Sequence, residues 1–224
     1  MAISEWPVSE QPRQKLYDQG PSALSDAELL AVIFGSGTKG RSAVDVGRRL
    51  LERFGTIGNF LTADREESLE QLGIGPVRLL VLQAALELAR RQYFDQLQVG
   101  PVRPDTETAN RYRQMRLRDL PYEVFCCLHL DARHRLITFD ELFRGTIDHA
   151  HVHVGEVARQ VLLRNSASVI FAHNHPSGVP APSNADIEIT QRLRRALREL
   201  DVQVVDHVVV GDGKCVSLAK RGLL

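Results

Sequence analysis

The sequence predicts an α/β/α sandwich built around a mixed sheet and preceded by a small all-helical domain. The first hundred residues carry helical apolar spacing and lack the β-branched enrichment typical of strands. After that point, short apolar runs alternate with helical patterns, and all 8 histidines and all 3 cysteines lie beyond residue 125. Strands that alternate with helices are typical of α/β folds. We therefore expect a helical domain over residues 1–100 and an α/β domain over residues 101–224.

The composition excludes several classes of protein. The 28 basic and 28 acidic residues cancel, so the chain has no overall positive field for non-specific nucleic-acid binding. Three cysteines, with Cys126 and Cys127 adjacent, fit neither a disulfide framework nor a cysteine-rich zinc site. The longest apolar stretch, residues 79–89, is too short to span a bilayer, and the beginning of the chain does not resemble a signal peptide. We expect a soluble, cytoplasmic protein.

Capping signals locate the helices of the first half. Ser25 and Glu28 form the S-x-x-E pattern of a capping box ahead of the apolar run LLAVIF. Ser42 can cap a second helix, whose apolar residues lie on one side. Further helices are expected near residues 57–61, near residues 66–72, and from the end of the Gly-Ile-Gly-Pro turn at residues 73–76 through residue 89.

In the second half of the chain, segments with the apolar spacing of helices alternate with segments typical of strands. A polar helix is expected near residues 106–117, and VFCCLHLD with RLITFDELF predicts a β-hairpin over residues 124–143. A helix near residues 155–163 then precedes the apolar strand SVIFAH at residues 168–173. The segment after Ser183 has the spacing of an amphipathic helix. Residues 202–210 and 214–218 form a second hairpin across a Gly-Asp-Gly turn.

The segment that carries chemistry is FAHNHPSGVPAPSNADIEIT. His173 and His175 stand two apart at the end of a strand, so both imidazoles leave the same face. Asp186 lies in the first turn of the next helix, where its carboxylate can point back toward them. Two imidazoles and one carboxylate suit Zn²⁺ and leave a fourth position for water. Each piece also has an ordinary interpretation, since Ser183 and Asp186 match a helix cap and a His-x-His pair can be surface decoration.

These residues resemble the motif of a broad group of proteins and, more closely, that of one bacterial family. His173-x-His175, then seven residues, Ser183, two residues and Asp186 resemble the JAMM motif of the MPN-domain metalloproteases. More closely, HNHPSG followed by PSNADI, with ELFRGT upstream and DHVVVG downstream, resembles the bacterial RadC family along nearly the whole chain. The resemblance implies that the two histidines and Asp186 bind zinc and that Ser183 helps to stabilise an oxyanion. It also implies an MPN-like mixed sheet with helices on both faces, similar to the cytidine-deaminase architecture.

A hydrolase of this kind also needs an upstream glutamate that moves a proton from water to the leaving amine. Glu141 in FDELFRGT is the first candidate, because it ends a strand that could lie beside SVIFAH. Glu156 and Glu123 are the alternatives. Glu156 begins a helix, where its negative charge interacts favourably with the helix dipole, so its presence there requires no catalytic role.

Two other histidine patterns are weaker signals. His149, His151 and His153 would share one face of a strand, yet no carboxylate stands at a matching distance, so metal binding there is the less favoured interpretation. RadC sequences usually carry Pro-Arg-Glu where this chain has Val-Gly-Glu at residues 154–156. His207 lies among apolar residues and is expected to be hydrogen-bonded in the core or to support a metal ligand.

Two features of the first half suggest other ligands. GSGTKGRS at residues 35–42 nearly matches a phosphate loop, but a helix rather than a strand precedes it, which argues against nucleotide binding. Gly73 and Gly75 between two helices resemble a helix-hairpin-helix, whose backbone amides can contact a DNA phosphate, with Arg78 as the nearest cation. With 11 basic and 13 acidic residues in the first hundred, such DNA binding should be weak and sensitive to salt.

The sequence therefore supports two functions from different classes. The first is a zinc-dependent peptidase or isopeptidase of the JAMM type, acting on a protein or peptide substrate. The alternative is a DNA-binding accessory protein of repair or recombination, in which the metal site is vestigial or structural. A metal-dependent nuclease is a weaker third option, because one zinc site lacks the second metal common in phosphodiester chemistry.

Overall fold

The computed structural model describes residues 3–62, 72, 74–102, 106–145 and 152–224. The chain forms two compact units, Met1–Leu88 and Ala89–Leu224, and the boundary falls within the long helix α6 (Pro76–Val99). Each unit has hydrophobic clusters of its own. Among the described residues, no helix combines the length and the apolar character needed to cross a bilayer.

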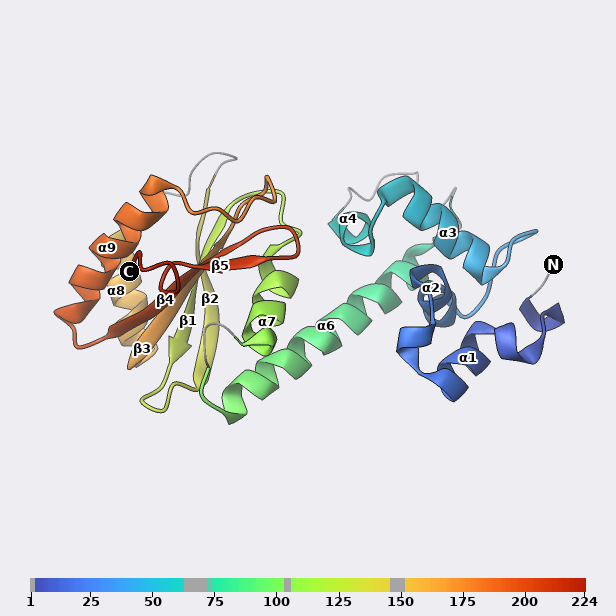
Figure 1. Cartoon of the computed structure of the whole chain (residues 1–224), viewed down its shortest axis with the longest axis horizontal. Helices are drawn as coiled ribbons and strands as arrows, with labels where there is room; N and C mark the ends of the chain where they lie inside the picture. The colour runs from blue at the N-terminus through green and yellow to red at the C-terminus, as the bar shows by residue number, and fades with distance from the viewer. Residues whose placement is uncertain (1–2, 63–71, 73, 103–105, 146–151) are drawn as a thin grey trace. The chain divides into compact units, whose positions relative to one another are not determined.

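The first unit is helical in its described part, as the sequence predicts (Figure 1). Its elements are three short 3₁₀ helices (Ile3–Glu5, Val8–Glu10 and Pro21–Ala23), α1 (Pro12–Gln19), α2 (Asp26–Phe34), α3 (Ala43–Phe54), α4 (Ile57–Thr62) and the first part of α6. Capping boxes begin α2 and α3, Ser25 with Glu28 and Ser42 with Asp45. The helix expected near residues 66–72 lies outside the described residues, apart from Leu72.

The second unit contains a five-stranded sheet in its described residues, in the order β2-β1-β3-β4-β5. The strands are β1 (Val124–Leu130), β2 (Leu136–Arg144), β3 (Ser168–Asn174), β4 (Gln203–Val210) and β5 (Cys215–Ser217), and the helices besides α6 are α7 (Glu107–Leu117), α8 (Val154–Leu163) and α9 (Asn184–Arg198). Strands β3 and β4 are parallel and the other pairs are antiparallel, so the sheet is mixed as expected.

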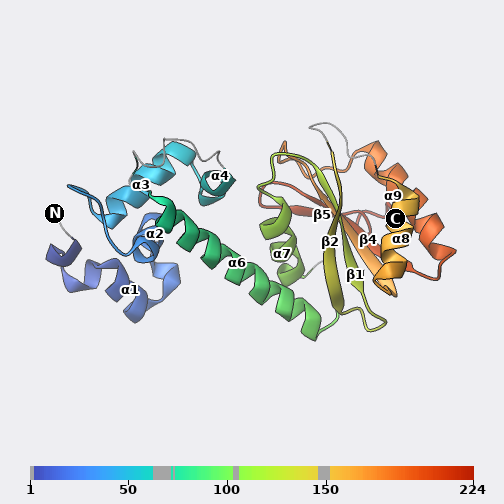
Figure 2. The same ribbon diagram turned by 180° about the vertical axis from the view of Figure 1, so that it is seen from behind.

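Helices cover both faces of this sheet (Figures 1 and 2). On the α7 face, Tyr112 and Leu117 of that helix pack in one cluster with Cys126 and Leu128 of β1. On the α8–α9 face, both helices pack against the alternate residues of β1, including Phe125. The α/β/α sandwich is therefore confirmed, and the alternation along β1 tells us which side chains can meet on each face.

A β-bulge interrupts the pairing of β2 with β1. Phe125 pairs with Phe143 but Cys126 pairs with Glu141, so Leu142 is an extra residue in β2. Leu142 and Phe143, although consecutive, both pack against the cluster on the α8–α9 face. Beyond the bulge the side chains of β2 have changed faces, and Glu141 lies on the α7 face with its partner Cys126.

Candidate metal centre

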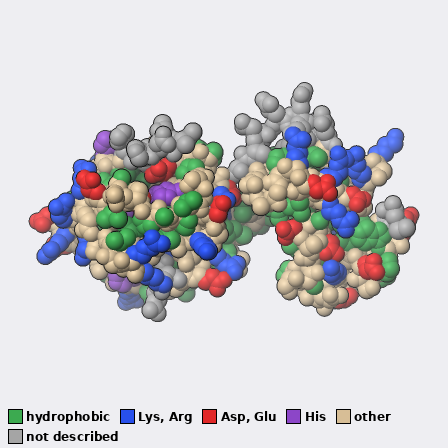
Figure 3. All heavy atoms as spheres, turned by 45° about the horizontal axis from the view of Figure 1, so that its top comes forward, with side chains coloured by type: hydrophobic (Ala, Val, Ile, Leu, Met, Phe, Trp, Pro, Cys, Tyr) green, Lys and Arg blue, Asp and Glu red, His purple; other side chains and the backbone are tan. Residues whose placement is uncertain are grey.

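Three side chains converge at the end of β3, as the sequence predicts. Nε2 of His173 lies 2.9 Å from Nε2 of His175 and 3.2 Å from Oδ1 of Asp186. Nε2 of His175 lies 3.6 Å from Oδ2 of the same carboxylate. His173 is buried, whereas His175 and Asp186 are half-buried. Figure 3 shows histidine side chains that reach the surface of this unit among hydrophobic and polar atoms.

The loop between the two histidines and Asp186 is held in place by the turn that follows β4, and we call it the braced loop. Residues 175–182 turn at Gly178, whose φ of +78° is in the left-handed region. The amide of Asp212 donates to the carbonyl of Gly178 (2.8 Å), and a Cβ on Gly211 would stand 2.4 Å from that same carbonyl oxygen. The Gly-Asp-Gly turn after β4 therefore fits against the loop only because Gly211 has no side chain.

The first turn of α9 orients Asp186. Ser183 is the N-cap, and its backbone amide and its hydroxyl both donate to Oδ2 of Asp186, each at 2.7 Å. Burial alone would raise the pKa of Asp186, but hydrogen bonds that His173 and His175 donate when they are protonated, together with the one from Ser183, outweigh it and hold the pKa below its ordinary value. Asp186 can therefore take part in the helix cap and face the two histidines at the same time, and its carboxylate stays ionised.

The hydrogen-bond partners of His175 determine its neutral tautomer. Its Nδ1 lies 2.8 Å from the carbonyl oxygen of Val179, which can only accept, so Nδ1 carries the proton. The unprotonated Nε2 then faces His173 and Asp186. The Asp186 carboxylate, which would accept a hydrogen bond from a protonated Nε2, is the largest cause of a raised pKa of His175, and the charge of Glu123 adds to it. A proton or a metal ion at Nε2 is therefore favoured.

A chain of contacts determines the tautomer of His173 in the same way. The hydroxyl of Thr190 donates to the carbonyl of Asp186 (2.5 Å), so its oxygen must accept from Nδ1 of His207 (2.5 Å). Nε2 of His207 then accepts from Nδ1 of His173 (2.8 Å). Burial lowers the pKa of His207 well below its ordinary value and keeps the ring neutral, as this chain requires. His173 is left with an unprotonated Nε2.

The group therefore presents three electron-pair donors to one point. In their neutral tautomers, two imidazole nitrogens and a carboxylate face one another with no proton between them, an arrangement that repels unless a cation stands there. For tetrahedral Zn²⁺, with bonds near 2.0–2.1 Å, neighbouring ligand atoms stand about 3.3 Å apart. The two imidazole nitrogens stand 2.9 Å apart, each lies 3.2–3.6 Å from one of the two carboxylate oxygens, and one ligand atom from each residue lies within 4.8 Å of the others. The donor set fits zinc.

The position of Glu141 argues against its assignment as the base. Because of the bulge, its side chain lies on the α7 face, whereas Phe125 and its cross-strand neighbour His173 belong to the α8–α9 face. The Glu141 carboxylate contacts Arg116 of α7 (3.3 Å) and Arg144 (3.2 Å). The expectation that Glu141 stands beside the metal ligands is thereby corrected. Its partners indicate a structural ion-pair network.

Glu123, one of the alternatives, lies on the correct face. It precedes β1, two residues before Phe125, and Phe125 is the register partner of His173. Alternation therefore directs the half-buried Glu123 toward the α8–α9 face, and its charge helps to raise the pKa of His175. In the sequence, Glu123 stands two positions before Phe125, so the two share a face of the strand. This spacing becomes informative only once Phe125 is known to pair with His173.

The remaining candidate residues lie apart from the His-His-Asp group or outside the residues that the structure describes. Glu156 is half-buried on α8, and hydrogen bonds from Arg159 and then Gln160 lower its pKa to about 2. His149 and His151 lie outside the described residues, and His153 packs edge-on against Phe143. Within the described part of the chain, only the His-His-Asp group brings three potential metal ligands together.

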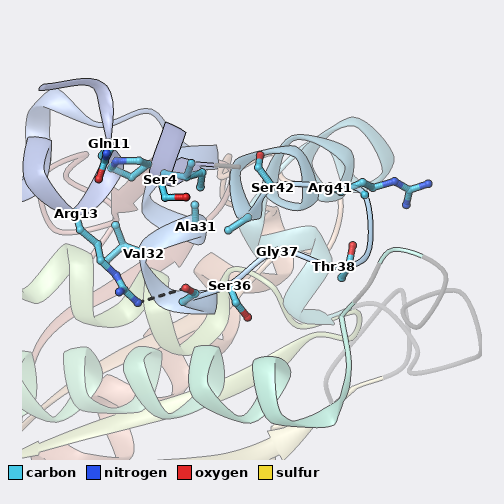
Figure 4. Close-up of a pocket in the computed structure, with 15 residues that line it drawn as sticks. Ser4, Gln11, Arg13, Ala31, Val32, Ser36, Gly37, Thr38, Arg41 and Ser42 are labelled. Carbon is cyan, nitrogen blue, oxygen red and sulfur yellow. Dashed lines mark hydrogen bonds between the residues drawn. The ribbon is translucent and has the colours of Figure 1, made fainter. Parts of the chain in front are cut away.

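The first unit has a separate cavity of about 560 Å³ beside the loop that resembles a phosphate loop (Figure 4). Helix α2 precedes this loop, as expected, so the strand of a true phosphate loop is missing. The guanidinium of Arg13 donates to the carbonyl of Gly35 (3.3 Å), while the Arg41 side chain points away from the cavity.

Arg78 braces the same loop. Its guanidinium donates to the carbonyls of Ser36 (2.6 Å) and Gly37 (2.8 Å) and lies over the ring of Phe34. The cation expected to contact DNA thus has partners within the chain. Of the two glycines of the expected helix-hairpin-helix, Gly73 lies outside the described residues.

Comparison with known families agrees with this geometry. A family model described as a RadC-like JAB domain matches residues 104–223, and a second, described as UPF0758 N-terminal, matches residues 3–80. The second unit is therefore a RadC-like JAB domain, and the His-His-Asp group lies at the end of its strand β3.

Relatives extend the match to both units. The chain is 53% identical over 224 residues to a UPF0758 protein of Nitrosococcus oceani, 51% to one of Thioalkalivibrio sulfidiphilus and 50% to one of Cellvibrio japonicus, in each case covering 100% of both chains. The chain belongs to the RadC family, which confirms the resemblance found in its sequence.

Proposed function

We propose that this protein is a zinc-dependent peptidase or isopeptidase in which His173, His175 and Asp186 hold the metal. The observation that carries the proposal is the convergence of two unprotonated imidazole nitrogens and one carboxylate, whose ligand atoms lie within 4.8 Å of one another. The JAB superfamily includes metallopeptidases, which supports the same reaction class.

Zinc, when bound, supplies a Lewis acid that makes water a nucleophile at neutral pH. In this proposal Glu123 takes the proton from the attacking water and later gives it to the departing amine. The Asp186 carboxylate, held by the amide and hydroxyl of Ser183, keeps its place as a ligand. Ser183 can also donate to a developing oxyanion, because its backbone amide still holds Asp186 when the hydroxyl turns away.

Metal content tests the ligand assignments. We expect about one zinc per chain, by elemental analysis, in the wild-type protein and in Glu123→Gln, because the glutamine keeps the shape of a side chain that is not a ligand. His173→Ala, His175→Ala and Asp186→Ala should each lose the zinc. Glu141→Gln, which changes a carboxylate on the other face, is the matched control. Equal zinc content in all these variants would reject the site.

Turnover tests the base. The wild-type protein and Glu141→Gln should cleave at least one member of a panel of quenched fluorescent peptides and lysine isopeptides, while Glu123→Gln keeps its zinc and loses at least about 100-fold in rate. A Glu123→Gln variant as active as the wild-type protein would assign the proton transfer to another group.

The DNA-binding alternative gains no support from the described residues of the first unit. Arg78, the cation expected at the DNA phosphate, is occupied by the backbone of residues 36–37 and by Phe34. A gel-shift titration at low salt remains the direct test of that function.

A further inference from the structure

Asn174, the residue between the two histidines, is buried and bonds to a different part of the chain. Its Oδ1 accepts from the amide of Val124 (2.8 Å), and its Nδ2 donates to the carbonyls of Tyr122 (3.0 Å) and Leu120 (3.4 Å). The amide orientation follows from these partners, because the reversed group would oppose donors to donors and acceptors to acceptors. Asn174 therefore bonds on both sides of Glu123.

These bonds continue the sheet ladder by one step. In an extended chain, the carbonyl of one residue and the amide two positions later point to the same side, as the groups of Tyr122 and Val124 do here. The backbone of Asn174 itself pairs with Val210 of β4. Its side-chain amide thus takes the place of a peptide group opposite the start of β1 and holds Glu123 extended.

The opposite side of Glu123 is held as well. Its own carbonyl accepts from the amide of Gly145 (2.9 Å), just beyond the end of β2. Bonds to both neighbouring segments restrain the backbone around Glu123, and alternation with Phe125 directs its side chain to the face of His173. The buried amide of Asn174 therefore holds the backbone on either side of the residue that carries this carboxylate.

We propose that Asn174 is a positioning residue that holds Glu123 beside the candidate metal centre. The inference rests on the proposed function, because it concerns the group assigned as base. One strand end would then serve both parts of the site: His173 and the following His175 supply metal ligands, and Asn174 between them positions the carboxylate.

Asn174→Ala tests this in the full-length protein, with two measurements that do not require turnover. The first is hydrogen exchange of the Val124 amide by NMR without metal, which we expect to become about tenfold faster once its buried acceptor is removed. The second uses Co²⁺, which binds similar nitrogen and oxygen ligands and broadens the NMR signals of nearby nuclei. The carboxyl ¹³C signal of Glu123, identified by its loss in Glu123→Gln, should be less broadened in Asn174→Ala than in the wild-type protein.

Two further variants separate positioning from general damage. Asn174→Asp has nearly the same size and keeps the acceptor for Val124, but it opposes an oxygen to the carbonyls of Tyr122 and Leu120. It should retain the slow exchange of Val124 and still weaken the broadening at Glu123. Asn59→Ala, which removes an amide that bonds to the backbone of the first unit, should change neither measurement.

The outcomes distinguish the inference from the function on which it rests. Unchanged Val124 exchange and unchanged broadening at Glu123 in Asn174→Ala would overturn the inference alone. Loss of Co²⁺ binding in Asn174→Ala would also overturn it, since Asn174 would then serve the histidines rather than Glu123. Failure of the wild-type protein to bind Co²⁺ would instead reject the metal centre itself.

Discussion

At the scale of single residues, hydrogen-bond acceptors outside the metal-ligand group decide which nitrogens can bind a metal. The carbonyl of Asp186 determines the donor direction of Thr190, which determines the tautomers of His207 and then of His173. The helix that carries Asp186, a candidate metal ligand, therefore also determines the tautomer of His173 through its own backbone. A carbonyl group can only accept a hydrogen bond. When one stands at the end of such a chain, it determines which nitrogen of each histidine ring carries the proton.

Thr190→Val tests this chain. Valine keeps the shape but leaves Nδ1 of buried His207 without an acceptor, so we expect zinc affinity to fall by roughly 10–100-fold in competition with a fluorescent chelator. Thr190→Ser keeps the hydroxyl and should stay close to wild type. Undiminished affinity in Thr190→Val would show that the tautomer of His173 is determined elsewhere.

At the scale of secondary-structure elements, the sequence predicted most of the fold because local signals determine it. The capping box at Ser25, the helix cap at Ser42 and the turn of the second hairpin depend on neighbouring residues, and all three are confirmed. The bulge at Leu142 was not predictable, since it arises where two strands pair. Because one extra residue reverses the faces of a strand, it moved Glu141 away from the histidines and left Glu123 as the carboxylate on their face.

The braced loop carries a prediction of its own. Gly211→Ala would place a Cβ against the carbonyl of Gly178 and the ring of Pro180, so we expect about 1–3 kcal/mol of lost stability in urea unfolding. Zinc affinity should fall as well, because the loop carries Val179, the acceptor for His175.

Gly155→Ala is the matched control for this substitution. A Cβ there meets no atom within 4 Å, and the residue lies inside α8, so alanine should be neutral or slightly stabilising. A Gly211→Ala protein as stable as Gly155→Ala would show that the loop can relax away from the turn.

At the scale of the whole molecule, the chain divides into two units with separate hydrophobic clusters, and the candidate metal centre belongs entirely to the second. A ligand that binds one folded unit stabilises that unit by mass action and leaves an independent neighbour unaffected. The two parts should therefore respond separately to metal and to mutation.

Differential scanning calorimetry checks this separation. We expect two transitions, of which zinc at about 100 times its Kd raises only one, by an amount equivalent to about 2.7 kcal/mol. Leu50→Ala in the core of the first unit should lower the other transition, since such substitutions cost about 2–5 kcal/mol. In His175→Ala the zinc-dependent shift should disappear. A single transition that both changes move would mean that the units unfold together.

The bulge in β2 also affects how the protein behaves at high concentration. Among the described residues, strand β2 is one edge of the sheet, and a straight edge offers free backbone groups to any second chain that can lie alongside it. The extra residue twists this edge, and the ion pairs of Asp140 with Arg164 and of Glu141 with Arg116 place charge on both of its sides. Removing Leu142 would leave only the irregularity opposite His129 and Leu130 in this strand, and we expect the straighter edge to increase edge-to-edge aggregation.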